Sequence, residues 1–273
     1  IHFAGSATVT AETPDYADLI VAKDGCNKGI PADATYPFDL HVQVGNAYSP
    51  TDPADLFTYD GLVISIVTAA AKPYLDAGAV ITVKGTGLDN VNNVTLNDPA
   101  APGNGDVVGS NLWTKHSSTA IVFPAPATVS KDLPSHGGPF TQTRYAFEFH
   151  VILGTITDPN RQPNFNFLGP QLTSVTPTSG ALKGGKPITI HGNGFQHATR
   201  VYFRLAGDPS HATSLTSSQY KVSTDGRTLT IRKAPNLSSL IPAHATGTQT
   251  FAISVDLDNA ETPATSADLY SVP

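Results

Sequence analysis

The sequence predicts an all-β protein made of tandem sandwich domains, and three observations support this. Among 273 residues there are 23 glycines and 22 prolines, and only 14% of residues are charged. Short apolar runs alternate with turn residues, whereas the Leu, Ala, Glu and Lys spacing of long helices is missing. Residues 81–88 (ITVKGTGL) return as residues 188–195 (ITIHGNGF) at an offset of 107. A repeat of this length corresponds to one domain.

A second repeat joins the start of the chain to its end. The sequence PADLF at 53–57 returns as SADLY at 266–270, an offset of 213 that is close to twice 107. The same offset pairs Phe38 with Phe251, Asn46 with Asn259 and Ala47 with Ala260. The two repeats divide the chain into three units at 1–60, 61–168 and 169–273.

The third unit shows its strands most clearly. Turns are expected at 176–180 and 192–194, where Gly and Pro gather. Strands are expected at 171–175, 188–190, 201–203, 229–231, 251–257 and 267–270. Seven or so short strands in about 105 residues are typical of an immunoglobulin-like sandwich.

The segment LTSVTPTSGALKGGKPITIHGNGFQHATRVYF (172–203) resembles the opening of an IPT/TIG domain, an early-set immunoglobulin-like fold. That family shows the pattern I-x-x-V/I-x-P-x-x-G, then G-G, then V-T-I-x-G-x-G-F and V-x-F. The matching positions are Val175, Pro177, Gly180, Gly184, Gly185, Ile188, Ile190, Gly192, Gly194, Phe195, Val201 and Phe203. The Gly-x-Gly turn permits positive φ directly after a strand, and the aromatic that follows can close the end of the sandwich.

The second unit matches this pattern less completely. Ala69–Ala71 replaces the Pro and Gly of the first turn, Leu88 replaces the aromatic, and residues 97–143 predict extended loops. The matching positions are Ile64, Ile66, Gly78, Ile81, Val83, Gly85, Gly87, Leu88, Val94 and Leu96. The departures affect the loops and leave the predicted fold unchanged.

The first unit, 1–60, lacks its first strands and cannot close a two-sheet core alone. Either the chain is cut from a longer array, or a neighbouring molecule donates the missing strands and links subunits head to tail. The units join through almost no linker, at 57–64 and 167–170. Such short connections predict a semi-rigid rod of domains.

The chain lacks the motifs of an enzyme. There is no Gly-x-Ser-x-Gly elbow, phosphate loop or HExxH spacing, so we expect no catalytic residues and no cofactor. Asp256, Asp258 and Glu261 form the best acidic cluster and are weak calcium candidates, with a solvated turn as the alternative. Trp113, together with Tyr145, is a candidate for stacking on a sugar ring, with ordinary packing as the alternative.

Composition also bounds the partners and the location. A net charge of −6 argues against nucleic acid, and no apolar stretch is long enough to insert into a membrane. Cys26 is the single cysteine, so it cannot form a disulfide within the chain, and we expect it to be a free thiol. Asn93 and Asn236 begin N-glycosylation sequons. A single cysteine fits either a reducing interior or an exterior. The low Lys content and the richness in Thr, Ser, Asn, Asp and Pro favour an extracellular or cell-surface location, and the two sequons are compatible with it.

The sequence therefore predicts an extracellular structural protein, a tandem repeat unit of a surface filament, stalk or adhesin that can polymerise head to tail. Its partners would be neighbouring copies or domains of the same array. The alternative function is a glycan- or protein-binding accessory module of a larger surface enzyme or receptor. For that function the long loops of 97–143 would form the binding surface, and the partner would be a glycan or a cell-surface protein.

Overall fold

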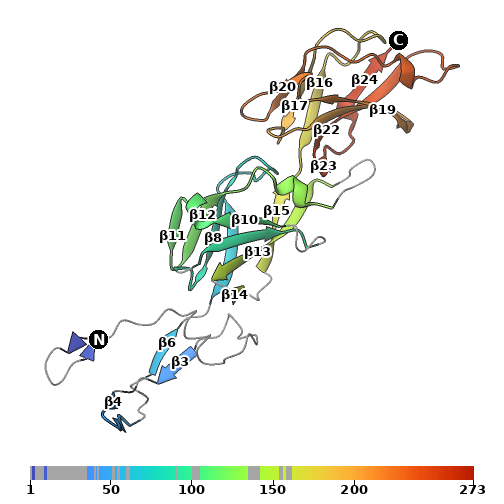
Figure 1. Ribbon diagram of the computed structural model, residues 1–273. Helices are drawn as coiled ribbons and strands as arrows, with labels where there is room; N and C mark the ends of the chain where they lie inside the picture. Colours follow the sequence, from blue (N-terminus) through green and yellow to red (C-terminus); the bar gives the residue numbers. More distant parts are fainter. Residues whose placement is uncertain are drawn as a thin grey trace.

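The protein is all-β, and its domains lie end to end (Figure 1). The computed structural model describes residues 2–3, 9–10, 36–39, 41, 43–50, 53, 56–59, 62–89, 91–99, 105–134, 142–153, 156–157 and 162–273. Within these residues the regular elements are β-strands and short 3₁₀ turns. Cys26 lies outside the described residues. No helix in the described part is long and apolar enough to cross a membrane.

The middle sandwich, β7 to β15, consists of two antiparallel sheets. The first has the order β11–β12–β8–β7, and the second has the order β10–β9–β13, with β14 and β15 pairing on the far side of β13. The strands are β7 (Val63–Ala69), β8 (Val80–Thr86), β9 (Asn93–Asn97), β10 (Asp106–Gly109), β11 (Lys115–Ser117), β12 (Ala120–Pro124), β13 (Arg144–Leu153), β14 (Ile156–Thr157) and β15 (Gln162–Leu168).

The C-terminal sandwich, β16 to β24, repeats this topology. One sheet has the order β16–β17–β21–β20, and the other has β19–β18–β22, with β23 and β24 beyond β22. The strands are β16 (Gln171–Thr176), β17 (Ile188–Asn193), β18 (Arg200–Leu205), β19 (Asp208–Thr216), β20 (Tyr220–Val222), β21 (Thr228–Ile231), β22 (Gln249–Leu257), β23 (Ala260–Glu261) and β24 (Leu269–Val272). The strand order agrees with the repeat of 107 residues.

Each sandwich buries one face of every central strand. In β17 the side chains of Ile188 and Ile190 are buried, and in β18 those of Val201 and Phe203 are buried opposite them. The ring of Phe203 packs edge-on against Tyr270 with centroids 6.2 Å apart. This period of two is what a half-buried strand requires, and it fixes the register.

The two glycines of each Gly-x-Gly turn perform different tasks. Gly87 and Gly194 have φ of 65° and 75°, as the sequence predicts. Gly85 and Gly192 instead allow a neighbouring strand to approach, because a Cβ there would lie 1.8 Å from the carbonyl oxygen of Val63 and 2.0 Å from that of Gln171. The residue after each turn, Leu88 or Phe195, is fully buried and closes the end of its core.

The described part of the first unit carries the second repeat. β1 (His2–Phe3) pairs with β2 (Val9–Thr10), β3 (Tyr36–Asp39) with β6 (Leu56–Tyr59), and β4 (Gln43–Val44) with β5 (Ala47–Tyr48). Phe38 pairs with Phe57, and the residues 213 positions later, Phe251 and Tyr270, pair in the same way. Val44 with Ala47 likewise becomes Leu257 with Ala260. The β4–β5 hairpin is therefore the counterpart of the β22–β23 hairpin.

Candidate functional site

The joint between the two sandwiches is built around the tip of the β22–β23 hairpin. Leu257 and Ala260 belong to the C-terminal sandwich by sequence, yet both are fully buried in the hydrophobic cluster of the middle sandwich. The side chain of Ala198, after the Gly-x-Gly turn, packs against both clusters. One domain therefore completes the core of the other, which restricts the angle between them.

Asn259, at the hairpin tip, fastens this joint with two hydrogen bonds. Its Nδ2 donates to the carbonyl oxygen of Lys131 at 3.0 Å and to that of Leu133 at 2.9 Å. Both acceptors lie at the end of a 3₁₀ turn, η3 (Val129–Asp132), on the middle sandwich. Asp258 supplies the sharp turn beside it with φ of 52°, a conformation that Asp adopts more readily than most residues.

Asp76 holds the 3₁₀ turn η3, which carries these acceptors, in place. Its side chain is only 3% exposed, and Oδ1 accepts the backbone N–H of Ser130 at 2.8 Å while Oδ2 accepts the hydroxyl of the same serine. Burial raises the pKa of Asp76 to about 6, although both bonds to Ser130 act in the opposite direction. A continuous set of contacts thus runs from Asp76 through Ser130 to the carbonyls that Asn259 binds.

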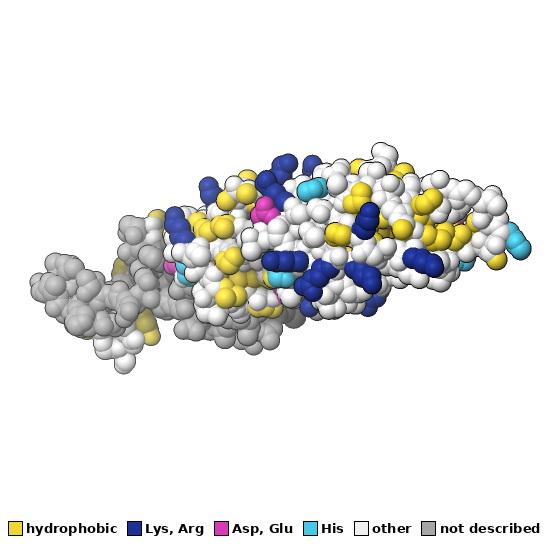
Figure 2. All heavy atoms as spheres, turned by 90° about the horizontal axis from the view of Figure 1, so that it is seen from above, with side chains coloured by type: hydrophobic (Ala, Val, Ile, Leu, Met, Phe, Trp, Pro, Cys, Tyr) yellow, Lys and Arg dark blue, Asp and Glu magenta, His cyan; other side chains and the backbone are white. Residues whose placement is uncertain are grey.

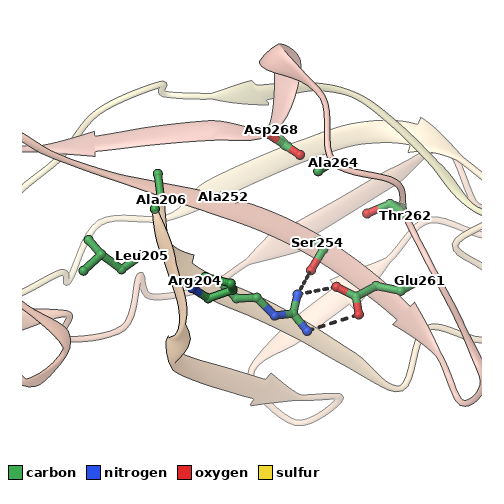
Figure 3. A pocket seen from close by; sticks show the side chains of 11 residues that line it. Arg204, Leu205, Ala206, Ala252, Ser254, Glu261, Thr262, Ala264 and Asp268 are labelled. Carbon is green, nitrogen blue, oxygen red and sulfur yellow. Dashed lines mark hydrogen bonds and ion pairs between the residues drawn. The ribbon is translucent and has the colours of Figure 1, made fainter. Parts of the chain in front are cut away.

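On the other side, a buried ion pair holds the hairpin to β18 (Figure 3). The guanidinium of Arg204 binds both carboxylate oxygens of Glu261, with Nη2 to Oε2 at 3.1 Å, and Nη1 also donates to Ser254 Oγ at 2.6 Å. The side chain of Glu261 is 4% exposed and that of Arg204 is 19% exposed. Two-point binding in a shielded place fixes the direction of β23, and with it the position of Asn259.

A small pocket of about 160 Å³ lies beside this ion pair, between β18, β22 and the segment before β24. Its walls are mainly apolar side chains such as Leu205, Ala252 and Pro209. Asp268 lines it as well, with Oδ2 accepting the N–H of Thr265 and Oδ1 buried without a hydrogen-bond partner in the structure. The pocket offers one free acceptor but no nucleophile with an adjacent base.

The three acidic residues considered for calcium are separated in their roles. Glu261 binds Arg204, Asp256 Oδ2 accepts the hydroxyl of Thr199 at 3.4 Å, and Asp258 forms the hairpin turn. Among the described residues, no group of three or more His, Cys, Asp or Glu side chains is arranged to hold a metal ion. The calcium site stays a prediction, and the geometry favours the joint as the function of this loop.

The other candidate residues lie in the middle sandwich or on the C-terminal surface. Trp113 is partly buried against the core, packs edge-on with His116 at 4.7 Å, and has its Nε1 buried without a partner. Tyr145 is 2% exposed. Asn93 faces outward from β9, whereas Asn236 is exposed and accepts the N–H of Ser238. Stacking on a sugar and glycosylation stay predictions.

The stability of the joint is predicted to depend on pH, because burial raises the pKa of two of its carboxyls, Asp76 and Asp256. Burial, followed by the nearby charge of Glu261, raises the pKa of Asp256 to about 7, well above the usual value near 4. The folded chain therefore binds more protons than the unfolded chain between these values. The resulting stability is complete below about pH 4, the ordinary pKa of the unfolded carboxyl, and it is lost progressively as the pH rises from there through about 7, the pKa of Asp256 in the folded chain.

This expectation is tested by comparing unfolding temperatures at pH 5 and pH 8 for the wild type and Asp256→Asn. The wild type should lose stability on going to pH 8, and the Asn variant, which cannot ionise, should lose less. Equal losses in both proteins would show that Asp256 does not control the pH dependence.

Comparison with known proteins gives one family match and several distant structural likenesses. The model of the IPT/TIG domain matches residues 170–270, so this part of the chain is an IPT/TIG domain. No curated protein matches the chain.

Three solved structures that match the chain show low sequence identity and low TM-scores. SGBP-B from a xyloglucan utilization locus of Bacteroides uniformis is 18% identical, with coverage of 73% of this chain and 48% of that one and a TM-score of 0.24. The surface glycan-binding protein PbSGBP-B of Prevotella bryantii is 13% identical, with coverage of 74% and 41% and a TM-score of 0.25. The plexin A4 extracellular region is 15% identical, with coverage of 76% and 16% and a TM-score of 0.27. The chain spans less than half the length of each.

Proposed function

We propose, from the IPT/TIG domain at residues 170–270 and the same strand order in the middle sandwich, that this chain is an extracellular structural array. It acts as a spacer unit of a surface filament, stalk or adhesin, and its role depends on its length and stiffness. The observation that carries the proposal is the joint, where Leu257 and Ala260 complete the core of the neighbouring domain.

The physical argument concerns stiffness. Domains that touch only through a flexible linker sample many angles, whereas a buried apolar contact with two directional hydrogen bonds selects one angle. Asn259 provides the hydrogen bonds, and Arg204 with Glu261 fixes the hairpin that carries it. Stiff joints allow a row of small domains to hold a distant group at a defined distance from a surface.

Small-angle scattering of the full chain tests this function. We expect one extended conformation in which the two sandwiches keep a constant distance, at both low and high salt. Electron micrographs of surface material from the source cells should show the chain in rods or polymers. A scattering curve that requires many interdomain angles, or a chain found only as isolated globules, would contradict the proposal.

A further inference from the structure

The β4–β5 hairpin is the counterpart of the β22–β23 hairpin, but its apolar side chains are exposed. We call such a hairpin a plug, and we call the surface of the neighbouring domain that receives it a socket. Val44, Asn46 and Ala47 correspond to Leu257, Asn259 and Ala260, with the same strand pairing at the same offset. Leu257 is fully buried in the neighbouring sandwich, but Val44 is 75% exposed and Tyr48 is 65% exposed. Large apolar side chains exposed together at a hairpin indicate an interaction surface.

The socket that receives the β22–β23 hairpin has a counterpart at the far end of the C-terminal sandwich. In the middle sandwich η3 accepts the hydrogen bonds of Asn259, and the segment at Tyr74, which bridges Leu168, faces the Gly194 turn at the same joint. In the C-terminal sandwich Ser179 bridges Ser271 in the same parallel sense, and a 3₁₀ turn, η4 (Ser238–Leu240), occupies the place of η3.

This end lies opposite the joint. β17 runs from Ile188, paired with Ile231 near η4, to Asn193, next to the Gly194 turn that faces Tyr74. Figure 1 places the C-terminus at this end and the β4 hairpin at the other end of the molecule. The described part of the chain therefore carries the β4–β5 hairpin at one end and the surface that contains η4 at the other.

The far end also carries a basic groove, with a volume of about 520 Å³, lined by the exposed cations Lys183, Arg232 and Lys233. Two loops are pinned together to form it. The N–H of Gly185 donates to Ala234 O at 3.0 Å, and the N–H of Ala234 donates to Lys186 O at 2.8 Å. None of these lysines and arginines forms an ion pair with a carboxylate of the described residues.

The first and the third sequence units have net charges of opposite sign. Residues 1–60 contain nine Asp and Glu but two Lys, a net charge of −7. Residues 169–273 contain eight Lys and Arg against six Asp and Glu, a net charge of +2. On the face seen in Figure 2, Lys and Arg side chains are frequent and acidic side chains are few. Opposite net charges favour head-to-tail approach over head-to-head approach.

We propose that a second copy of this chain docks its β4–β5 hairpin onto the far end of the C-terminal sandwich, beside the basic groove. The contact repeats the internal joint between different molecules, with Val44 in the place of Leu257. Such a contact is heterologous, because each copy uses a different surface, and it propagates into a filament unless it closes into a ring. This inference rests on the proposed function as a structural array.

The first test uses sedimentation velocity of the full chain at low and high salt. The wild type should associate at low salt and dissociate as salt screens the charge. Val44→Asn should weaken association by about 10-fold or more, because it removes an apolar side chain from the contact. Val107→Asn is the matched control, since Val107 is another exposed strand valine, at 60%, and should associate as the wild type does.

The second test reverses the charge of the groove in a triple variant that carries Lys183→Glu, Arg232→Glu and Lys233→Glu. Its control carries Lys72→Glu, Lys84→Glu and Lys115→Glu, the same change of charge at exposed positions on the middle sandwich. The groove variant should lose association and the control should keep it. The groove variant keeps its hairpin intact, and the Val44→Asn variant keeps its groove intact. A mixture of the two should therefore form dimers through this one pair of intact surfaces, but it should not form larger assemblies.

Three outcomes would overturn the inference. They are a wild type that stays monomeric at low salt, a groove variant that associates like its control, and two variants that do not complement each other. If the wild type stays monomeric and binds dextran sulfate, and the groove variant does not bind it, the groove is a polyanion-binding site and the inference is wrong. A stiff scattering curve alongside any of these outcomes would leave the proposed spacer function standing.

Discussion

Replacing Leu257 with alanine is expected to uncouple the two sandwiches and to lower the free energy of unfolding by about 2 to 5 kcal/mol. The leucine side chain is fully buried in the cluster of the domain next to its own. Shortening it leaves a cavity where the two cores meet, and the domain that supplies the side chain loses its main apolar anchor. Calorimetry should then show the two sandwiches unfolding at separate temperatures, and scattering should show a wider range of interdomain angles.

Leu269→Ala is the matched control for this experiment. Leu269 lies in the same sandwich, at the start of β24, but its side chain is 39% exposed. We expect a change within about 0.5 kcal/mol and an unaltered interdomain angle. Similar behaviour of the two leucine variants would mean that the hairpin contact does not couple the domains.

The second large effect is expected at the buried ion pair of Arg204 and Glu261. Arg204→Ala leaves the Glu261 carboxylate buried with its charge uncompensated, which should lower the free energy of unfolding by about 3 to 5 kcal/mol. Because Glu261 lies in the return strand of the hairpin, two residues after Asn259, the loss should also weaken the hydrogen bonds of Asn259 across the joint. Hydrogen exchange of the backbone amides of β23 reports this loosening directly.

A double variant separates the effect of the charge from that of the packing. In Arg204→Met with Glu261→Leu both charges are removed and apolar volume is kept, so most of the stability should return. Arg200→Ala, on the same strand but exposed, should change stability by less than about 0.5 kcal/mol. A double variant as unstable as Arg204→Ala would show that the guanidinium acts through its packing.

Local patterns explain why the fold was predictable from sequence. The alternation around Ile188 and Ile190 and the Gly-x-Gly turns depend on residues close together in the chain, and each repeats after 107 residues. The structure refined one point, since only the second glycine of each turn has positive φ and the first makes room for a neighbouring strand. That requirement comes from a strand 20 or so residues away, which a local pattern does not show.

The joint was not predictable in the same way. Asp76 and Ser130 are 54 residues apart, and Asn259 is more than 120 residues from its acceptors, so no spacing along the chain connects them. The one available signal was the pair Asn46 and Asn259 at the repeat offset of 213. That signal marked a repeated hairpin but not the surface against which it packs.

The sequence by itself determined the central strands, the Gly-x-Gly turns and the repetition of one domain, because these follow from periodicity and from the backbone freedom of glycine. The prediction of extended loops over 97–143 was wrong in part, since β10, β11 and β12 lie there. Only the tertiary structure decided that Asp256, Asp258 and Glu261 are divided among a joint, a turn and an ion pair. It also decided that cations from two separate loops line one groove. The reason is physical: burial and ion pairing depend on which distant surfaces meet, and that is fixed only when the sheets have packed.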